Sequence, residues 1–351
     1  MTVVGLHHIT LVARDMQRTI DFYTQILGLN VVKQTVNFDD PSSYHIYFGD
    51  STGRPGTVVT YFEWPEAPKG AHGIGGTHHY AMSVQDRSVL LKWKRRLTDL
   101  GIEVRGPFDR TYFESIYFDD PDGVIIELAT AGPGFGVDEP LDALGQIEQR
   151  PPLDVTAQGR DNETIAAETW PEPVEGIEPD MTLSSGMHHI TAIGADIHRT
   201  HAFFGELLGL RLVKQTINFD DPNSKHWYWS TAADGQPGTL ITYFERDPKK
   251  TRIARLGVGH THHFALAVSD EDSLLAWRAR LVDAGLTVSP VRDRTYFKSI
   301  YTKDPDGQIV ELATLGPGFM VDEPAESLGT SLLLPPHVDP AAVATPALRV
   351  R

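Results

Sequence analysis

The segment Asp109–Pro140 reads DRTYFESIYFDDPDGVIIELATAGPGFGVDEP, and Asp293–Pro324 reads DRTYFKSIYTKDPDGQIVELATLGPGFMVDEP. The two segments are identical at 25 of 32 positions, at a constant offset of 184 residues. Upstream, the motif His-His-Ile-Thr at 7–10 recurs at 188–191, an offset of 181. A repeat over most of the chain indicates that one fold has been duplicated. We therefore divide the chain into a first repeat (1–152), a linker (153–186), a second repeat (187–336) and a tail (337–351).

Each repeat divides again into two modules with the order strand, helix, strand, strand, strand. In the first module an alternating strand at 6–13 precedes an amphipathic helix at 15–27, for which Asp15 is the expected N-cap and Gly28 the stop. The second module repeats this order, with a strand at 79–84 and a helix at 87–100. Four such modules predict an α+β fold, in which helices cover one face of each sheet.

The composition excludes several kinds of site and partner. The 351-residue chain has no cysteine, which excludes disulfides, thiolate nucleophiles and Cys-ligated metals, so any metal must bind His, Asp or Glu. A net charge of −16 argues against a general nucleic-acid binder. No signal peptide or membrane-spanning run is recognisable. We expect a cytoplasmic protein with no nucleic-acid or membrane partner; whether it forms a homo-oligomer stays open.

The linker accounts for much of this charge. Its 34 residues, 153–186, hold eight acidic residues and one arginine, a net charge of 1 − 8 = −7. Such a segment is expected to be solvated, either disordered or a short surface helix.

Single polar residues interrupt strands that are otherwise apolar. Because side chains alternate across a strand, His8, His263 and Glu311 are expected on the faces that the helices leave uncovered. A buried carboxyl without a partner costs several kcal/mol or takes up a proton, so Glu311 requires an explanation. The same strand positions recur in the other two modules as His189, His79 and Glu127.

Two imidazoles and one carboxylate form the ligand set of the facial triad that binds Fe(II) in non-haem oxygenases. Mn(II) suits the same ligands, whereas zinc prefers a tetrahedral site with fewer open positions. The sequence therefore predicts two candidate metal sites, each built from two histidines and one glutamate.

The His-His strands, the Pro-Gly-Thr turns at 55–57 and 237–239 and the closing D-P-D-G-x-x-x-E-L-A strand at 304–313 resemble the vicinal oxygen chelate superfamily of glyoxalases, bleomycin resistance proteins and extradiol dioxygenases. Within it, Leu-His-His-Ile-Thr and Arg-Thr-Tyr-Phe-x-Ser-x-Tyr resemble the hydroquinone ring-cleaving dioxygenases. The resemblance implies two cup-shaped mixed sheets, with a metal site shared between the first and last modules. It ranks His8, His263 and Glu311 as the primary site; the complete second set of ligands departs from the family pattern.

The same resemblance implies roles for five further residues around the substrate: His7, Thr10, His262, Arg294 and Tyr301. Arg294 would hold a phenolate or an acidic product through charge-assisted hydrogen bonds. Tyr301, ten residues before Glu311, would donate a proton to a developing oxyanion. His262 is a candidate proton shuttle, although simple alternation places it on the helix side of its strand.

The function implied is an oxidoreductase, an extradiol-type ring-cleaving dioxygenase. It would use Fe(II), or Mn(II) in its place, and O2 to open hydroquinone or substituted phenolic and catecholic rings. Two alternatives stay open. A glyoxalase-like metal-dependent lyase or isomerase normally uses four protein ligands per cup, and a non-catalytic small-molecule-binding protein of the resistance type needs none.

Overall fold

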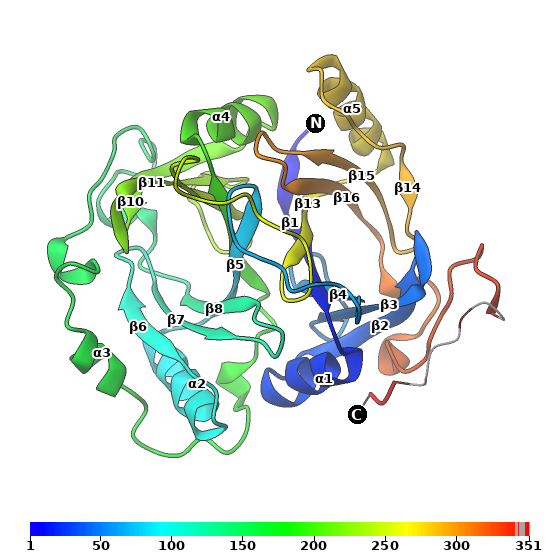
Figure 1. Cartoon of the computed structure of the whole chain (residues 1–351), viewed down its shortest axis with the longest axis horizontal. Coiled ribbons are helices and arrows are strands. Elements are labelled where there is room, and N and C mark those ends of the chain that lie inside the picture. Colours follow the sequence, from blue (N-terminus) through cyan, green and yellow to red (C-terminus); the bar gives the residue numbers. More distant parts are fainter. Residues whose placement is uncertain (341–342, 344–347, 351) are drawn as a thin grey trace. The chain divides into compact units, whose positions relative to one another are not determined.

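Two eight-stranded mixed sheets make up most of the computed structural model (Figure 1). The structure describes residues 1–340, 343 and 348–350. The predicted tail, 337–351, therefore lies partly outside the described residues, at 341–342, 344–347 and 351. Each sheet is the centre of one compact unit. Unit 1 comprises Met1–Ala71, Asp120–Val124 and Ala254–Arg351, and unit 2 comprises His72–Asp119 and Ile125–Ile253.

The sheet of unit 1 combines the first and the fourth module. Its strands, in spatial order, are β14 (Arg292–Asp293), β15 (Phe297–Lys303), β16 (Ile309–Pro317), β13 (Thr261–Val268), β1 (Val3–Ala13), β4 (Val58–Glu63), β3 (Asp40–Gly49) and β2 (Asn30–Asn37). Its helices are α1 (Met16–Asp21) and α5 (Glu271–Asp283). The pairs β1–β4 and β13–β16 are parallel, and the central pair β1–β13 is antiparallel.

The sheet of unit 2 combines the second and the third module in the same way. Its strands, in spatial order, are β10 (Arg211–Asn218), β11 (Asp221–Ser230), β12 (Leu240–Glu245), β9 (Met187–Gly194), β5 (Gly76–Val84), β8 (Ile125–Thr130), β7 (Glu114–Asp119) and β6 (Arg105–Asp109). Its helices are α2 (Arg87–Asp99), α3 (Asn162–Ala167) and α4 (Ile197–His201).

The repeats of the sequence and the compact units are therefore different divisions of the chain. In each module the first strand has a partner from its own module on one edge only. Backbone N–H and C=O groups on the other edge also need partners when they are buried. The antiparallel pairs β1–β13 and β5–β9 supply these partners. Each pair joins a module of the first repeat to a module of the second. Figure 1 shows this as blue strands beside yellow and orange ones in unit 1.

The two helices whose bounds the sequence predicts, at 15–27 and 87–100, begin within one residue of the expected position. Asp15, Asp86, Asp196 and Asp270 are the N-caps of α1, α2, α4 and α5, and each carboxylate accepts a backbone N–H of the first turn. The helix expected at 15–27 is α-helical only over Met16–Asp21 and continues as a wider π-helical turn over Phe22–Ile26. Among the described residues, none of the helices combines the length and the apolar character needed to cross a bilayer.

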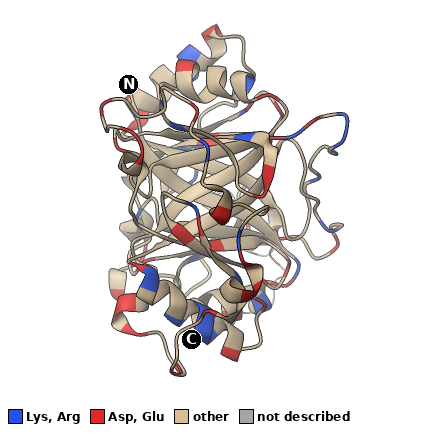
Figure 2. Ribbon diagram, turned by 90° about the vertical axis from the view of Figure 1, so that its left-hand side faces the viewer, with Lys and Arg blue, Asp and Glu red and all other residues tan. Residues whose placement is uncertain are grey.

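The apolar faces of the strands point towards the helices, as alternation predicts. Ile9, Leu11, Phe264 and Leu266 are fully buried in unit 1, where α5 packs against β15 and β16. Lys, Arg, Asp and Glu lie mostly on helices and loops, and the strands are largely free of them (Figure 2). The few charged groups inside the sheets therefore stand out.

The acidic linker packs along α2 rather than extending into solvent. Lys92 Nζ lies 2.6 Å from Glu178 Oε2 and 2.8 Å from Asp180 Oδ2. The Trp93 indole N–H donates to the Met181 carbonyl at 3.0 Å, and Lys94 Nζ donates to the Ile165 carbonyl at 2.9 Å. Two acidic residues of the linker, Glu178 and Asp180, thus pair with Lys92 of α2.

One buried ammonium group lies in each sheet. Lys33 on β2 is fully buried, with Nζ 2.6 Å from Asp322 Oδ1 and in contact with the Glu323 carboxylate. Lys214 on β10 makes the same contacts with Asp138 and Glu139. These Asp-Glu pairs belong to the repeated segment that follows the last strand of a module, so each ion pair holds that segment against the sheet.

We expect the substitution Lys33→Met to lower the free energy of unfolding by about 3–5 kcal/mol, because it leaves the buried Glu323 without a cation. Chemical denaturation measures this change. Lys303→Met, at an exposed position of the same unit, should change the stability by no more than about 0.5 kcal/mol. Equal effects of the two substitutions would show that the buried ion pair contributes nothing.

Candidate functional site

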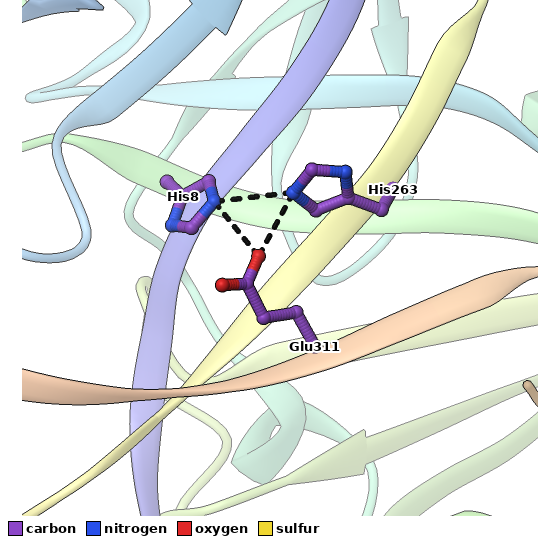
Figure 3. A group of neighbouring side chains, drawn as sticks. All are labelled: His8, His263 and Glu311. Atoms are coloured by element: carbon purple, nitrogen blue, oxygen red, sulfur yellow. Dashed lines mark hydrogen bonds and ion pairs between the residues drawn. The ribbon is translucent and has the colours of Figure 1, made fainter. Parts of the chain in front are cut away.

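Three polar side chains converge on the uncovered face of the unit 1 sheet (Figure 3). His8 lies on β1, His263 on β13 and Glu311 on β16, three neighbouring strands in the middle of the sheet. Glu311 Oε2 lies 3.1 Å from His8 Nε2 and 2.8 Å from His263 Nε2, and the two Nε2 atoms lie 3.4 Å apart. The register places Ala265 between His8 and Glu311, and its small side chain leaves the space that they fill.

Unit 2 contains the same arrangement. His189 lies on β9, His79 on β5 and Glu127 on β8. Glu127 Oε2 lies 2.8 Å from His79 Nε2 and 3.2 Å from His189 Nε2, and the two Nε2 atoms lie 3.3 Å apart. Ala81 stands between His189 and Glu127 in the register. Both predicted sets of residues are thus brought together with the same geometry.

The charges within each triad conflict unless a cation is present. Burial would raise the pKa of the Glu311 carboxyl, but electrostatic attraction to His8 and His263 outweighs burial and lowers that pKa well below its usual range. Burial also lowers the pKa of His263, which disfavours the protonated imidazole that the carboxylate requires. Within the described structure, neither oxygen of the fully buried Glu311 or Glu127 accepts a hydrogen bond of good geometry. A divalent cation would satisfy all three groups, because it replaces the missing protons.

A β-bulge at each His-His pair aligns the two rings. On β1, Leu6 pairs with Leu266 and His8 with Ala265, so His7 is the extra residue of the bulge. The register shifts in the same way at positions 78, 188 and 262. In all four pairs the Nδ1 atoms of the neighbouring rings lie 2.8–2.9 Å apart. The extra residue breaks the alternation, which explains how His262 comes to lie beside His263.

The network of hydrogen bonds assigns the tautomer of His8. His7 Nε2 lies 3.1 Å from the Thr314 carbonyl, which only accepts, so this nitrogen donates. Burial lowers the pKa of His7 to about 3, so the ring is neutral and its Nδ1 is an acceptor. His8 must then donate from Nδ1, and its Nε2 lone pair faces Glu311. The hydrogen bond from His8 Nδ1 to His7 thus fixes the ring of His8 with its Nε2 lone pair free to bind a metal.

A cavity of about 140 Å³ opens above the unit 1 triad. Three of the residues predicted to surround a substrate line it, namely His262, Arg294 and Tyr301. The described residues that line the cavity do not include His7 or Thr10, which are buried in the sheet beside it. His7 contacts His8, and the Thr10 hydroxyl accepts a hydrogen bond from Thr60 at 3.3 Å.

Arg294 and Tyr301 form a polar pair on one wall of this cavity. Tyr301 is the direct cross-strand partner of Glu311, as the even spacing predicts. Arg294 Nη2 donates to the Tyr301 hydroxyl at 3.4 Å and to Asp39 Oδ2 at 2.9 Å. Burial raises the pKa of the Tyr301 phenol, which therefore keeps its proton at neutral pH.

Two groups of lining residues were not assigned to the site from the sequence. His45 and Tyr47, on β3, line the cavity, and His45 Nε2 lies 2.6 Å from the Thr60 hydroxyl. Residues 37–39, Asn-Phe-Asp, line it as well. The signal was present in the repeated motif K-Q-T-[VI]-N-F-D-D-P at 33–41 and 214–222, which only indicated duplication.

A second cavity, of about 360 Å³, opens above the unit 2 triad. Its walls contain the counterparts of the unit 1 residues, namely His78, Arg110, Tyr117, His226 and Tyr228. Thr191, the counterpart of Thr10, also lines this cavity. The site that the family pattern ranks second is therefore as complete as the first and has the larger cavity.

Comparison with known proteins identifies related sequences over the whole chain. The family profile described as Glyoxalase/Bleomycin resistance protein/Dioxygenase superfamily matches residues 5–128 and 186–312. A Bacillus subtilis (strain 168) protein that is provisionally named ring-cleaving dioxygenase MhqO is 31% identical over 96% of this chain and 93% of its own length. The chlorohydroquinone/hydroquinone 1,2-dioxygenase of Sphingobium indicum is 28% identical over 96% of this chain and 93% of its own length.

A solved structure shares the architecture as well. The crystal structure of a Bacillus subtilis protein, provisionally named a dioxygenase, superposes with a TM-score of 0.78 at 28% identity. The superposition covers 100% of this chain and 99% of the other. This match extends the similarity to the arrangement of both sheets within their units.

We expect the purified chain to bind two divalent metal ions, one at each triad. Glu127→Gln and Glu311→Gln should each reduce this number to one, and the double variant should bind none, because an amide replaces the anionic ligand. Elemental analysis after dialysis measures the stoichiometry. If the double variant retained as much metal as the native protein, the triads would not be the binding sites.

We also expect His7→Phe to weaken metal binding at the unit 1 triad by about 10- to 100-fold, because His8 loses the acceptor that fixes its tautomer. His7→Asn keeps an acceptor oxygen near the place of Nδ1 and should retain more of the affinity. Competition titration against a chelator, in the Glu127→Gln background, measures both. Equal losses in the two variants would assign the effect to packing rather than to the tautomer.

Proposed function

We propose that this chain, which belongs to the Glyoxalase/Bleomycin resistance protein/Dioxygenase superfamily, is a ring-cleaving dioxygenase that uses Fe(II) and O2 to open hydroquinone or closely related phenolic rings. The superfamily is metal-dependent, and full-length relatives are named ring-cleaving dioxygenases. Catecholic rings are the alternative substrates, and Mn(II) the alternative metal.

The observation that carries the proposal is the triad of two histidines and one glutamate at the base of an aromatic cavity. Three side-chain ligands on one face of a metal leave positions for two further ligands, which is what a reaction between a phenolate and O2 requires. The orphaned carboxylates of Glu311 and Glu127 fit such a metal. Bound Fe(II) would supply the redox chemistry that lets O2 react with an aromatic ring.

The walls of the unit 1 cavity suit a planar ring. Phe38, Phe62 and Phe297 line it together with Tyr47, so an aromatic substrate would replace water against apolar faces. The small volume, about 140 Å³, favours a single ring with small substituents. These side chains would orient the ring with one hydroxyl towards the triad.

The polar residues of the wall would stabilise negative charge on the substrate and transfer protons to it. Arg294, placed 3.4 Å from the Tyr301 hydroxyl, would stabilise negative charge that develops on the ring oxygens. Tyr301 would donate its proton to such an oxygen, because its raised pKa keeps it protonated. Burial lowers the pKa of His262 to about 3, so this ring would pass a proton on rather than hold it.

The overall reaction balances without another reductant. One molecule of O2 enters the product, one carbon–carbon bond of the ring breaks, and both oxygen atoms are retained. The oxidised species is the aromatic ring, and O2 is reduced in the same step. No nicotinamide or flavin is needed, and the glycine-rich segment at 132–136 does not match a dinucleotide-binding pattern.

We expect the protein, reconstituted with Fe(II) without oxygen, to consume O2 when methylhydroquinone, a chlorohydroquinone or catechol is added. Uptake should reach one O2 per molecule of diol, measured with an oxygen electrode. The double variant Glu127→Gln/Glu311→Gln, loaded in the same way, is the control for uncatalysed oxidation. If protein that retains iron consumes no O2 with any of these diols above the control, the proposed function is wrong.

A further inference from the structure

The two cavities share their base but differ in their walls. The triads agree in ligand type, register and distances, whereas the cavity volumes are about 140 Å³ in unit 1 and about 360 Å³ in unit 2. Two copies that kept the same metal-binding geometry and changed their walls differ in what they admit. The differences in the walls are therefore informative about substrates.

The main difference is positive charge. Leaving the triads aside, the unit 1 cavity is lined by one arginine, Arg294, and one aspartate, Asp39. The unit 2 cavity is lined by four arginines and one aspartate: Arg105, Arg110, Arg160, Arg246 and Asp220. Arg105 and Arg246 also contact carboxylates outside the lining, Asp119 at 2.6 Å and Asp221 at 3.1 Å. The formal charge of the wall residues and these two partners is thus 1 − 1 = 0 in unit 1 and 4 − 3 = +1 in unit 2.

Arg246 occupies the position that Trp64 occupies in unit 1. Each residue follows the last strand of its module directly, and each donates its backbone N–H at the same place, Trp64 to Ala13 and Arg246 to Gly194. Trp64 stacks on Phe62 at an interplanar angle of 8°, and the Arg246 guanidinium lies 4.5 Å from the centre of the Phe244 ring. An indole stacked on Phe62 in unit 1 thus corresponds to a guanidinium over Phe244 in unit 2, where Arg246 lines the cavity and also contacts Asp221 at 3.1 Å.

Arg105 occupies the position of Ser289. Arg105 pairs across the strands with Tyr117, and Ser289 exchanges hydrogen bonds with the backbone of Tyr301, the counterpart of Tyr117. A short neutral side chain in unit 1 thus corresponds in unit 2 to a long cationic one, Arg105, which lines the cavity and also contacts Asp119 at 2.6 Å.

The linker contributes the fourth arginine. Arg160 lies over the Phe108 ring, 4.4 Å from its centre, and its Nη1 lies 2.5 Å from Asp220 Oδ1. Arg110 contacts the same aspartate at 3.3 Å. In unit 1 the corresponding aspartate, Asp39, pairs with one guanidinium among the described residues, that of Arg294. One carboxylate therefore faces two guanidinium groups in unit 2, and their positive charge exceeds its negative charge.

We propose that the unit 2 cavity binds an aromatic diol that carries a further anionic substituent, such as a carboxylate, and that the unit 1 cavity binds a smaller uncharged one. A carboxylate matches the paired donors of a guanidinium, and a cavity lined by several cations attracts an anion more strongly than bulk water does. The larger volume accommodates the additional group. Turnover of such a substrate rests on the proposed function, whereas its preferential binding does not.

The test separates the two cavities with the glutamate variants. Glu311→Gln leaves only the unit 2 triad intact, and Glu127→Gln leaves only that of unit 1. Anaerobic calorimetry on the Fe(II)-loaded variants compares methylhydroquinone with 2,5-dihydroxybenzoate, its carboxylated analogue. We expect the acid to bind Glu311→Gln at least about tenfold more tightly than Glu127→Gln, and added salt to reduce this preference.

Substitution with the unit 1 residues identifies the cause. In the Glu311→Gln background, Arg246→Trp and Arg105→Ser should each weaken binding of the acid by about tenfold relative to methylhydroquinone. Lys250→Ser removes a positive charge from an exposed position of the same unit and should leave that ratio unchanged. Equal binding of the acid by both glutamate variants, or an unchanged ratio in both arginine variants, would overturn the proposal.

Oxygen uptake by the same variants keeps the two proposals separate. Selective binding of the acid without O2 uptake from either diol would refute the dioxygenase and leave the anion site standing. Uptake with methylhydroquinone in both variants, without preferential binding of the acid, would refute the anion site and leave the dioxygenase standing.

Discussion

A carboxylate that is fully buried and has two imidazoles as its nearest polar neighbours is the constraint on which each unit depends. Desolvation of Glu311 or Glu127 opposes its negative charge, and desolvation of His263 or His79 opposes the positive charge that would compensate it. The conflict disappears when a cation binds. Three features place these groups close enough to bind one cation. They are the neighbouring central strands, the small alanines between the ligands, and the β-bulge at each His-His pair.

The duplication places each triad between modules from different halves of the chain. Both halves must therefore be present for either sheet to form, because β1 pairs with β13 and β5 with β9. The buried ion pairs of Lys33 and Lys214 act in the same direction, since each holds a segment of one repeat against a strand of the other. Folding stability and metal-site assembly are thus coupled through the same strand pairing.

The two units illustrate how a duplicated site diverges. Positions that contact the metal or orient its ligands agree between the units, as the hydrogen-bonded His-His pairs show. Several wall positions agree as well, but others differ, and the exchange of Trp64 for Arg246 is the clearest case. A change in the wall alters which ring enters without altering the coordination chemistry. Two substrate classes on one chain are therefore compatible with one reaction.

Much of the fold followed from local pattern: the repeat, the four modules, the N-cap at Asp15 and the face of each strand that carries His8, His263 and Glu311. Alternation failed at His262, because a bulge depends on pairing with a distant strand and leaves no local signal. The charged wall of the second cavity was also beyond the sequence, since Arg160 reaches it only because the linker packs against unit 2. The sequence by itself determined which residues can bind a metal, through side-chain chemistry and period-two alternation. Only the tertiary structure decided which residues surround that metal, because the cavity walls come from strands and loops far apart in the chain.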